Sequence, residues 1–389
     1  MRVVTSCFSR FHIFDQASQL HRLGVLENIL TACPKRWAKD WDIPQQKVVS
    51  LPLSGAYGYV VEKGLKKVHP LLGRLASESL HSHFSKRLAR YIPSTCDVFI
   101  GLSSLCLEAI IEAKKKGIFT VVDHGSVHQR AEKKILLEEC KLLSISIDEV
   151  VPSEWIIEKE EDEFEVADCV SVLSDVARRT LVEAGIPREK VMVNNCGVCL
   201  SDFKPYPKSD NIFRIIQCSA ITPTKGVHYL LQAFSELKLP DSELWIVGRG
   251  KEVSPLLPKI KQYAASNVYF KGAYPQAELS GIYSQGSIFV LPSLVDGFGM
   301  VVPQAMACGL PVIVTENVGA ADLVMEGKNG FIIPIRDVDA LKDRILRLYE
   351  NKDLLLDMSR NALRSVSDGY TWNDYGDRLL AELKERVCC

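Results

Sequence analysis

Residues 291–315 read LPSLVDGFGMVVPQAMACGLPVIVT. The apolar run that ends at Leu291 is typical of a buried strand. The pattern then predicts a glycine-bearing loop, a helix that begins near residues 299–302 and ends at Gly309, and a second buried strand after Pro311. Strand, loop, helix and strand in this order form one unit of a mainly parallel α/β sheet.

The same alternation extends outward over most of the chain. In the first half, apolar strand-like runs occur at 97–102, 118–123 and 169–174, each next to a helical pattern. A polar segment with two prolines, FKPYPKSDN at 203–211, is typical of a linker, and a new series of strand–helix units begins at Phe213. We therefore expect an α/β protein made of two doubly wound, Rossmann-like domains that face a cleft.

The predicted boundaries follow the linker and the last helical pattern. The N-terminal domain is expected over 1–208 and the C-terminal domain over 209–371. A final helix over 372–389 is expected to pack back on the first domain.

Composition agrees with a folded chain that has no global attraction to nucleic acid. Of 389 residues, 47% are hydrophobic and 24% are charged, and the formal net charge is -1. Residues 1–14 lack the pattern of a signal peptide, and nothing approaches the roughly 18 apolar residues of a membrane-spanning helix. These features predict a cytoplasmic protein, with peripheral contact at the inner face of a membrane left open.

A ligand site is expected where the loops of the second half follow their strands, because ligands of such sheets bind at the carboxyl ends of the strands. The loop glycines allow close backbone approach, and free N–H groups at a helix start favour a diphosphate. Asp296 and Gln304 would then flank a bound nucleotide sugar. The alternative is an ordinary strand–loop–helix in which glycine and proline only mark the ends.

Two further loops of the second half carry basic residues. Lys225 stands at the opening of a predicted helix, where its charge can meet phosphate, although such a lysine can equally be solvated. Gly248-Arg249-Gly250 follows a predicted strand and is expected to line a turn near the cleft. The candidate donor-binding residues are Ser219, Lys225, Arg249, Ala273, Gly297, Phe298, Gly299, Met300, Val301 and Gln304.

In the first half, the string DHGSVH at 123–128 lies at the carboxyl end of a predicted strand. Asp123, His124 and His128 are therefore candidate catalytic residues together with Asp296, since histidine can hydrogen-bond a sugar hydroxyl or carry a proton near neutral pH. The alternative is that both histidines are ordinary polar residues of a loop. No histidine, cysteine or carboxylate group has the spacing of a metal site, so no metal is expected.

Residues 62–91 combine seven basic residues with two acidic ones and carry apolar residues at near-helical spacing. A basic amphipathic helix is typical of contact with an anionic membrane surface or a phosphorylated acceptor. The alternative is a helix whose apolar face is buried and whose basic face is solvated. Both interpretations stay open.

Taken together, an ordered series of strings resembles the family-4 glycosyltransferases, which have the two-domain GT-B fold. The strings are ADCVSVLS, VNNCGVCLSDFKP, CSAITPTKG, LWIVGRG, VYFKGAY, the 291–315 segment and NVGAADLVMEGKNGFIIP. The match is strongest over 167–349. The resemblance implies a retaining enzyme that moves a sugar from a nucleotide-diphosphate donor to a glycan, lipid-linked or other hydroxyl acceptor without a metal or other cofactor.

The chain departs from the family pattern at three positions. Asp296 and Gln304 stand where the family usually has two glutamates, and Ala220 stands where an arginine often precedes the lysine matched by Lys225. The resemblance implies that residue 296 lies near the donor sugar, that residue 304 holds the ribose and that one histidine, His124 or His128, lies at the reacting centre. A catalytically silent nucleotide-sugar-binding protein is the alternative function that these departures leave open.

Overall fold

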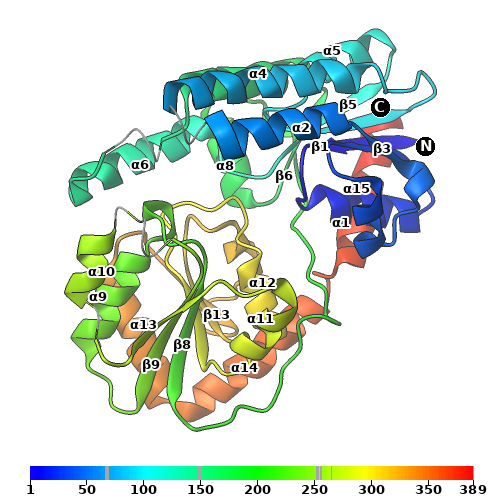
Figure 1. The fold of residues 1–389 in the computed structure, drawn as a ribbon. Coiled ribbons are helices and arrows are strands. Elements are labelled where there is room, and N and C mark those ends of the chain that lie inside the picture. Colours follow the sequence, from blue (N-terminus) through cyan, green and yellow to red (C-terminus); the bar gives the residue numbers. More distant parts are fainter. Residues whose placement is uncertain (66–69, 147–150, 251–253, 255, 264, 389) are drawn as a thin grey trace.

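The computed structural model describes residues 1–388 except 66–69, 147–150, 251–253, 255 and 264. It contains two parallel sheets, each flanked by helices (Figure 1). This confirms the predicted α/β class with two doubly wound halves. The predicted boundary after residue 208 lies in the connection between the two sheets, and the one after 371 lies at the start of the last helix.

The first sheet has the strand order β3-β2-β1-β4-β5-β6-β7. Its strands are β1 Val3–Cys7, β2 Leu26–Thr31, β3 Val48–Ser50, β4 Val98–Leu102, β5 Phe119–His124, β6 Cys169–Val172 and β7 Val191–Val193. Its helices are α1 Ile13–Arg22, α2 Pro52–Val60, α4 Pro70–Ala89, α5 Leu107–Lys115, α6 Gln129–Leu143, α7 Glu154–Val166 and α8 Asp175–Glu183.

The second sheet has the order β10-β9-β8-β11-β12-β13. Its strands are β8 Phe213–Cys218, β9 Ser242–Val247, β10 Val268–Gly272, β11 Ile288–Leu291, β12 Val312–Thr315 and β13 Gly330–Ile333. The helices are α9 Val227–Leu237, α10 Leu257–Tyr263, α11 Gln276–Tyr283, α12 Val301–Ala307, α13 Val338–Glu350, α14 Lys352–Ser367 and α15 Trp372–Cys388. In both sheets the strand order reverses beside the first strand, at β1/β4 and at β8/β11, and such switch points are where open α/β sheets bind ligands.

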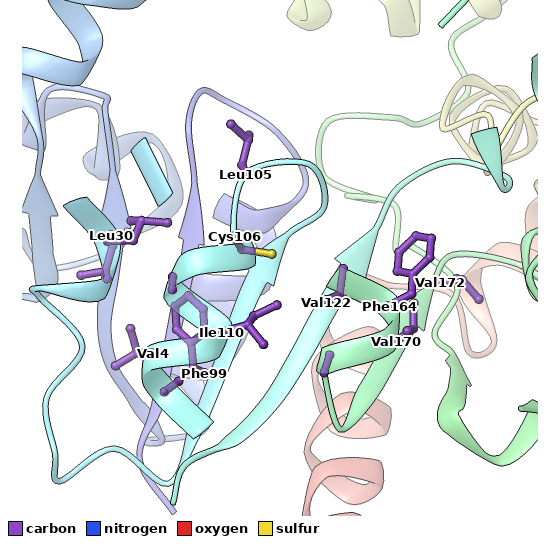
Figure 2. Close-up of a cluster of buried hydrophobic side chains, with 14 of the residues drawn as sticks. Val4, Leu30, Phe99, Leu105, Cys106, Ile110, Val122, Phe164, Val170 and Val172 are labelled. Atoms are coloured by element: carbon purple, nitrogen blue, oxygen red, sulfur yellow. The ribbon is translucent and has the colours of Figure 1, made fainter. Parts of the chain in front are cut away.

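Side chains alternate between the two faces of the first sheet and fill a separate core on each. On one face Val4, Phe99 and Val122 pack against Ile110 of α5 and Phe164 of α7 (Figure 2). On the other face the core includes residues of α1 and α15. A parallel sheet with both faces covered explains why its strands appear in the sequence as continuous apolar runs.

The last helix packs on the first domain. Tyr375, Leu379 and Leu383 of α15 recur every four residues, are fully buried, and share a core with α1. The Gln16 amide also donates to the Tyr375 hydroxyl at 2.9 Å. The chain therefore crosses back from the second sheet to the first at its end.

The basic segment 62–91 is not one amphipathic helix in the described residues. A π-helical turn, Val61–Leu65, precedes α4, and residues 66–69 lie outside the description. Of the apolar residues at near-helical spacing, Leu80, Phe84 and Leu88 are buried. Leu72, Leu75 and Tyr91 are exposed. None of the helices in the described part of the chain has the length and hydropathy of a membrane-spanning segment.

Candidate functional site

An ion pair joins the loops that follow β8 and β11. Lys225 Nζ lies 2.6 Å from Asp296 Oδ2, and both side chains are largely shielded, with 25% and 15% of their surface exposed. The two strands are neighbours across the switch point of the second sheet. The structure therefore brings together two predicted site residues that are 71 positions apart.

Lys225 lies at the opening of α9, as predicted, because it immediately precedes Gly226, the N-cap residue of that helix. A 3₁₀ turn, Pro223–Lys225, ends at Gly226, whose φ of +60° is in the left-handed region that glycine adopts without strain. A Cβ at this glycine would lie 2.0 Å from the Pro292 carbonyl oxygen, so the two loops touch there. This contact holds the turn that carries the ammonium group against the β11 loop.

The Asp296 loop is held from its other side by the segment after β12. The Asp296 N–H donates to Asn317 O at 3.0 Å, and Gly319 N–H donates to Asp296 O at 2.9 Å. Gly299 has a φ of +84°, which turns the chain from this bridge into α12. Backbone hydrogen bonds within the second domain thus hold the segment that presents the Asp296 carboxylate.

Gln304 lies on α12, the helix that follows the Asp296 loop. Only 8% of its surface is exposed. Its carboxamide carries both a donor and an acceptor, so it can pair with a ribose hydroxyl at this position. Of the loop residues before it, Phe298 is buried and Met300 and Val301 are half-buried.

The remaining predicted donor residues follow β8, β9 and β10 at the same edge of the sheet. Ser219 Oγ donates to Ala220 O at 3.1 Å, and a Cβ at Gly248 would lie 1.8 Å from Ser219 O, so these loops also touch. Arg249 and Ala273 are exposed. The structure therefore puts all the predicted donor residues on the loops and helix at one end of the second sheet, which fits a single site.

The first domain reaches this site through the loop after β5. A Cβ at Gly297 would lie 2.3 Å from Gly125 O and 2.5 Å from Ser126 Cα, so the DHGSVH loop contacts the loop that carries Asp296. Ser174 Oγ, at the start of α8, also donates to Gly297 O at 2.8 Å. Both domains thus contribute to the surroundings of the ion pair.

Glu132 is a residue of this site that the sequence did not reveal. It lies in the first turn of α6 and accepts from Ser126 Oγ at 3.3 Å. Burial raises the pKa of Glu132; the charge of Asp296 raises it further, and that of Lys225 lowers it. The carboxylate is therefore close enough to sense both members of the pair, and no sequence motif marks it.

His124 is held inside the first domain. It is 1% exposed, its Nδ1 lies 3.0 Å from Ser103 Oγ, and its Nε2 lies 3.0 Å from Val127 O. Burial is the main cause that lowers the pKa of His124 to about 4, so the ring is neutral at pH 7. In this arrangement the ring braces the DHGSVH loop.

His128 caps α6. Its Nδ1 accepts from Arg130 N at 3.2 Å, and 2% of the residue is exposed. Burial lowers the pKa of His128, although the nearby Glu161 opposes the effect. Both predicted histidines therefore lie at the expected loop, and both rings are engaged in holding its shape.

Asp123 is fully buried and has two side-chain partners from the loop and helix after β1. His12 Nε2 lies 2.8 Å from one carboxylate oxygen and Gln16 Nε2 donates to the other at 2.7 Å. His12 was not predicted. Its place just after the first strand, beside the switch point of the first sheet, is the signal that could have identified it.

In the described part of the chain, no three or more histidine, cysteine, aspartate or glutamate side chains come together in a group that could hold a metal ion. Lys225, Asp296, Glu132 and the exposed Arg249 bring charged groups to this end of the sheet.

Comparison with known proteins finds a family match for the second domain. Residues 201–365 match the model of the glycosyl transferases group 1 family. The second domain is a group 1 glycosyltransferase domain. It contains Lys225, Asp296 and Gln304, so the ion pair and the buried amide lie within the matched region.

Relatives and solved structures agree with this assignment. The chain is 30% identical over 250 residues to the GDP-mannose-dependent alpha-(1-6)-phosphatidylinositol monomannoside mannosyltransferase of Mycolicibacterium smegmatis, covering 57% of this chain and 63% of the relative. It is 30% identical to the putative colanic acid biosynthesis glycosyltransferase WcaL of Escherichia coli, covering 47% and 48%. The chain thus spans about half to two-thirds of the length of these relatives.

The fold is shared over the whole chain. A sucrose-phosphate synthase from Thermosynechococcus elongatus superposes with a TM-score of 0.71 at 16% identity, covering 100% of this chain and 99% of the other. Anabaena HepE, solved in complex with UDP, gives 0.70 at 18% identity, covering 99% and 100%. The GT-B architecture around the group 1 domain is therefore confirmed.

Proposed function

We propose that the protein is a retaining glycosyltransferase that moves a sugar from a nucleoside-diphosphate donor to a hydroxyl of a glycan or lipid-linked acceptor. One observation carries the proposal: within a group 1 domain, Lys225 and Asp296 meet at the switch point of the sheet, and the buried Gln304 amide lies on the adjoining helix. Cation, carboxylate and amide are the groups needed for diphosphate, sugar and ribose respectively.

In the proposed complex Lys225 leaves Asp296 and binds the diphosphate. Its positive charge stabilises the negative charge that grows on the departing phosphate oxygen as the bond to the anomeric carbon breaks. Asp296, fixed through its backbone, accepts hydrogen bonds from hydroxyls of the donor sugar. Gln304 binds the ribose, and its amide can both donate to and accept from a hydroxyl. With protein cations in this role, the reaction needs no metal ion.

The first domain supplies the acceptor side. The acceptor oxygen forms the new bond to the anomeric carbon, and its proton leaves with the diphosphate. The contact of Gly125 and Ser126 with Gly297 puts Glu132 beside this centre. Since His124 and His128 hold the loop, we propose that they support the acceptor site through its shape.

The relatives guide the choice of donor and acceptor for the test. One is named as GDP-mannose-dependent and acts on a phosphatidylinositol monomannoside, and HepE has been solved with UDP-glucose. Incubation with UDP- and GDP-sugars and lipid-linked or free glycans should release nucleoside diphosphate. It should also give a product whose anomeric configuration, measured by NMR, equals that of the donor. Inversion would refute the retaining mechanism, and donor binding without transfer would favour a silent binding protein.

We also propose that α2 and α4 contact an anionic membrane that carries the acceptor. Exposed apolar residues lie on these helices, at Leu53, Tyr59, Val60, Leu72 and Leu75, and basic residues of α4 include Arg74 and Lys86. Apolar insertion and charge attraction act together at such a surface. Flotation with liposomes should require anionic lipid, and Leu72→Ser with Leu75→Ser should reduce it. Equal recovery with neutral liposomes would contradict this contact.

A further inference from the structure

Helix α6 leaves the first domain and runs towards α9 of the second (Figure 1). Near its end the Glu139 carboxylate is fully buried against the second domain. It accepts from His228 Nε2 at 2.8 Å, from the Tyr229 hydroxyl at 2.9 and 3.1 Å, and from Arg336 Nε at 2.8 Å. One acid of the first domain thus binds three side chains of the second.

Both oxygens of the Glu139 carboxylate have hydrogen-bond donors. Burial would raise the pKa of Glu139, but the hydrogen bonds from His228 and Arg336 outweigh it and hold this pKa below its ordinary value. Removal of one partner of a buried charged group costs more than the net value of the contact, because the remaining groups stay desolvated. The contact is therefore sensitive to small changes at Glu139.

Arg336 holds a full turn of α6. Besides its bond to Glu139, its Nη2 donates to Ile135 O at 3.1 Å and its Nη1 lies 3.3 Å from Glu138 Oε2. Its φ of +64° is unusual for a residue other than glycine. The strained backbone aims the guanidinium at the helix, and the surrounding contacts must compensate for the strain.

The same face of α6 reaches the candidate active site. Glu132 precedes Glu139 by seven residues, which is about two helical turns, so both side chains project from one face. The helix also packs against the turn Pro223–Lys225. A displacement of the Glu139 end would therefore move Glu132 relative to Lys225 and Asp296.

We infer that Glu139 is a positioning residue for sugar transfer. Through His228, Tyr229 and Arg336 it fixes α6 on the second domain and so keeps the acceptor-side loop and Glu132 in register with the donor site. This inference rests on the proposed function. It predicts that loss of the Glu139 charge separates the domains and slows transfer, while the donor site within the second domain stays intact.

The test compares Glu139→Gln with Lys141→Gln, a change at an exposed residue in the last turn of the same helix. Small-angle X-ray scattering of each folded protein, without added ligand, measures the separation of the domains. Glu139→Gln should increase the radius of gyration and Lys141→Gln should not. The radius of gyration does not depend on turnover, so the comparison tests the positioning role even if the wild-type protein has no transferase activity.

Kinetics then separate a positioning role from a merely structural one. With UDP-glucose or GDP-mannose, whichever is turned over, kcat of Glu139→Gln should fall at least about tenfold while the donor KM changes by less than about threefold. Arg336→Lys keeps the positive charge but loses the planar guanidinium group that reaches Glu139 and Ile135 together. It should change kcat in the same direction, and it replaces Glu139→Gln in the test if that variant does not fold. Unchanged scattering and unchanged kcat in folded variants, or a loss confined to KM, would overturn the inference.

Discussion

Lys225 Nζ and Asp296 Oδ2 lie 2.6 Å apart, so a carboxylate of the β11 loop neutralises the cation that we propose for the donor diphosphate. Donor binding must exchange this internal partner for phosphate oxygens. The pair therefore links the affinity for the nucleotide to the residue that orients the sugar, and each member can be tested separately.

Lys225→Ala should weaken donor binding by about 10- to 100-fold, the range expected for loss of a charge-assisted hydrogen bond of ~1.5–3 kcal/mol. Calorimetry with the donor measures the effect. Lys328→Ala is a matched control, because this lysine is exposed and precedes β13 at the opposite end of the sheet. Equal affinities in Lys225→Ala and wild type would remove the phosphate role.

Asp296→Asn should have opposite effects on binding and on transfer. Without the competing carboxylate, Lys225 is free for phosphate, and affinity for the nucleoside diphosphate alone should rise by about fivefold, as for a partly exposed ion pair. Transfer from the full donor should slow strongly, because the sugar loses a charged acceptor. Weaker binding of the diphosphate in this variant would show that Asp296 does not compete for Lys225.

Gln304→Leu tests ribose recognition. The apolar side chain cannot pair with ribose hydroxyls, so the preference for a ribonucleoside diphosphate over its 2′-deoxy analogue should shrink, whereas Gln304→Glu should keep it because a carboxylate accepts from the same hydroxyls. Competition binding measures the ratio of the two affinities. An unchanged ratio in Gln304→Leu would contradict the assignment.

Gly297→Ala should weaken the contact between the domains. The new Cβ would lie 2.3 Å from Gly125 O, so the loops must separate, at a cost of about 1–3 kcal/mol typical of overpacking. Transfer should fall and thermal stability should decrease. Gly281→Ala is the control: nothing lies within 4 Å of its Cβ, and alanine favours the helix by up to ~1 kcal/mol. An active Gly297→Ala of normal stability would argue against the close approach.

The stability should depend on His124 between pH 4 and 6.5. Burial lowers the pKa of His124 in the folded protein to about 4 from 6.5, so between these values the unfolded chain binds more protons and folding stability falls as pH falls. The difference corresponds to about 3 kcal/mol. Asp15 and Glu163 have raised pKa values and act in the opposite direction.

His124→Asn isolates this contribution, since Asp15 and Glu163 are present in both proteins. Denaturant unfolding at pH 7 and at pH 5 should show that wild type loses more stability on acidification than the variant does. Parallel pH dependence of the two proteins would mean that the folded His124 titrates normally and is not held neutral by burial.

Periodicity and glycine punctuation were enough to predict the fold, because buried parallel strands are continuous apolar runs bounded by turns. The location of Lys225, Asp296 and Gln304 at one end of the second sheet was predictable as well, since each belongs to a local strand–loop–helix pattern. The pairing of Lys225 with Asp296 was not, because it depends on two strands becoming neighbours across the reversal of strand order.

Other parts of the site depend on contacts between elements that have no local signal. Glu132 and Glu139 look like ordinary surface acids of a helix until α6 is seen to lie on the second domain. His12 acquires its role only through the buried Asp123. The spacing of the apolar residues in 62–91 did not reveal which of them are buried and which are exposed.

The central claim is that Lys225 and its neighbours bind a nucleotide sugar. The most direct measurement is a thermal-shift screen of wild type and Lys225→Ala against UDP-, GDP-, ADP-, TDP- and CMP-sugars, because a ligand that binds the folded state raises its apparent stability. We predict stabilisation of the wild type by one nucleotide class and a much smaller effect in Lys225→Ala. Stabilisation by none of these sugars, or an equal shift in both proteins, would contradict the account.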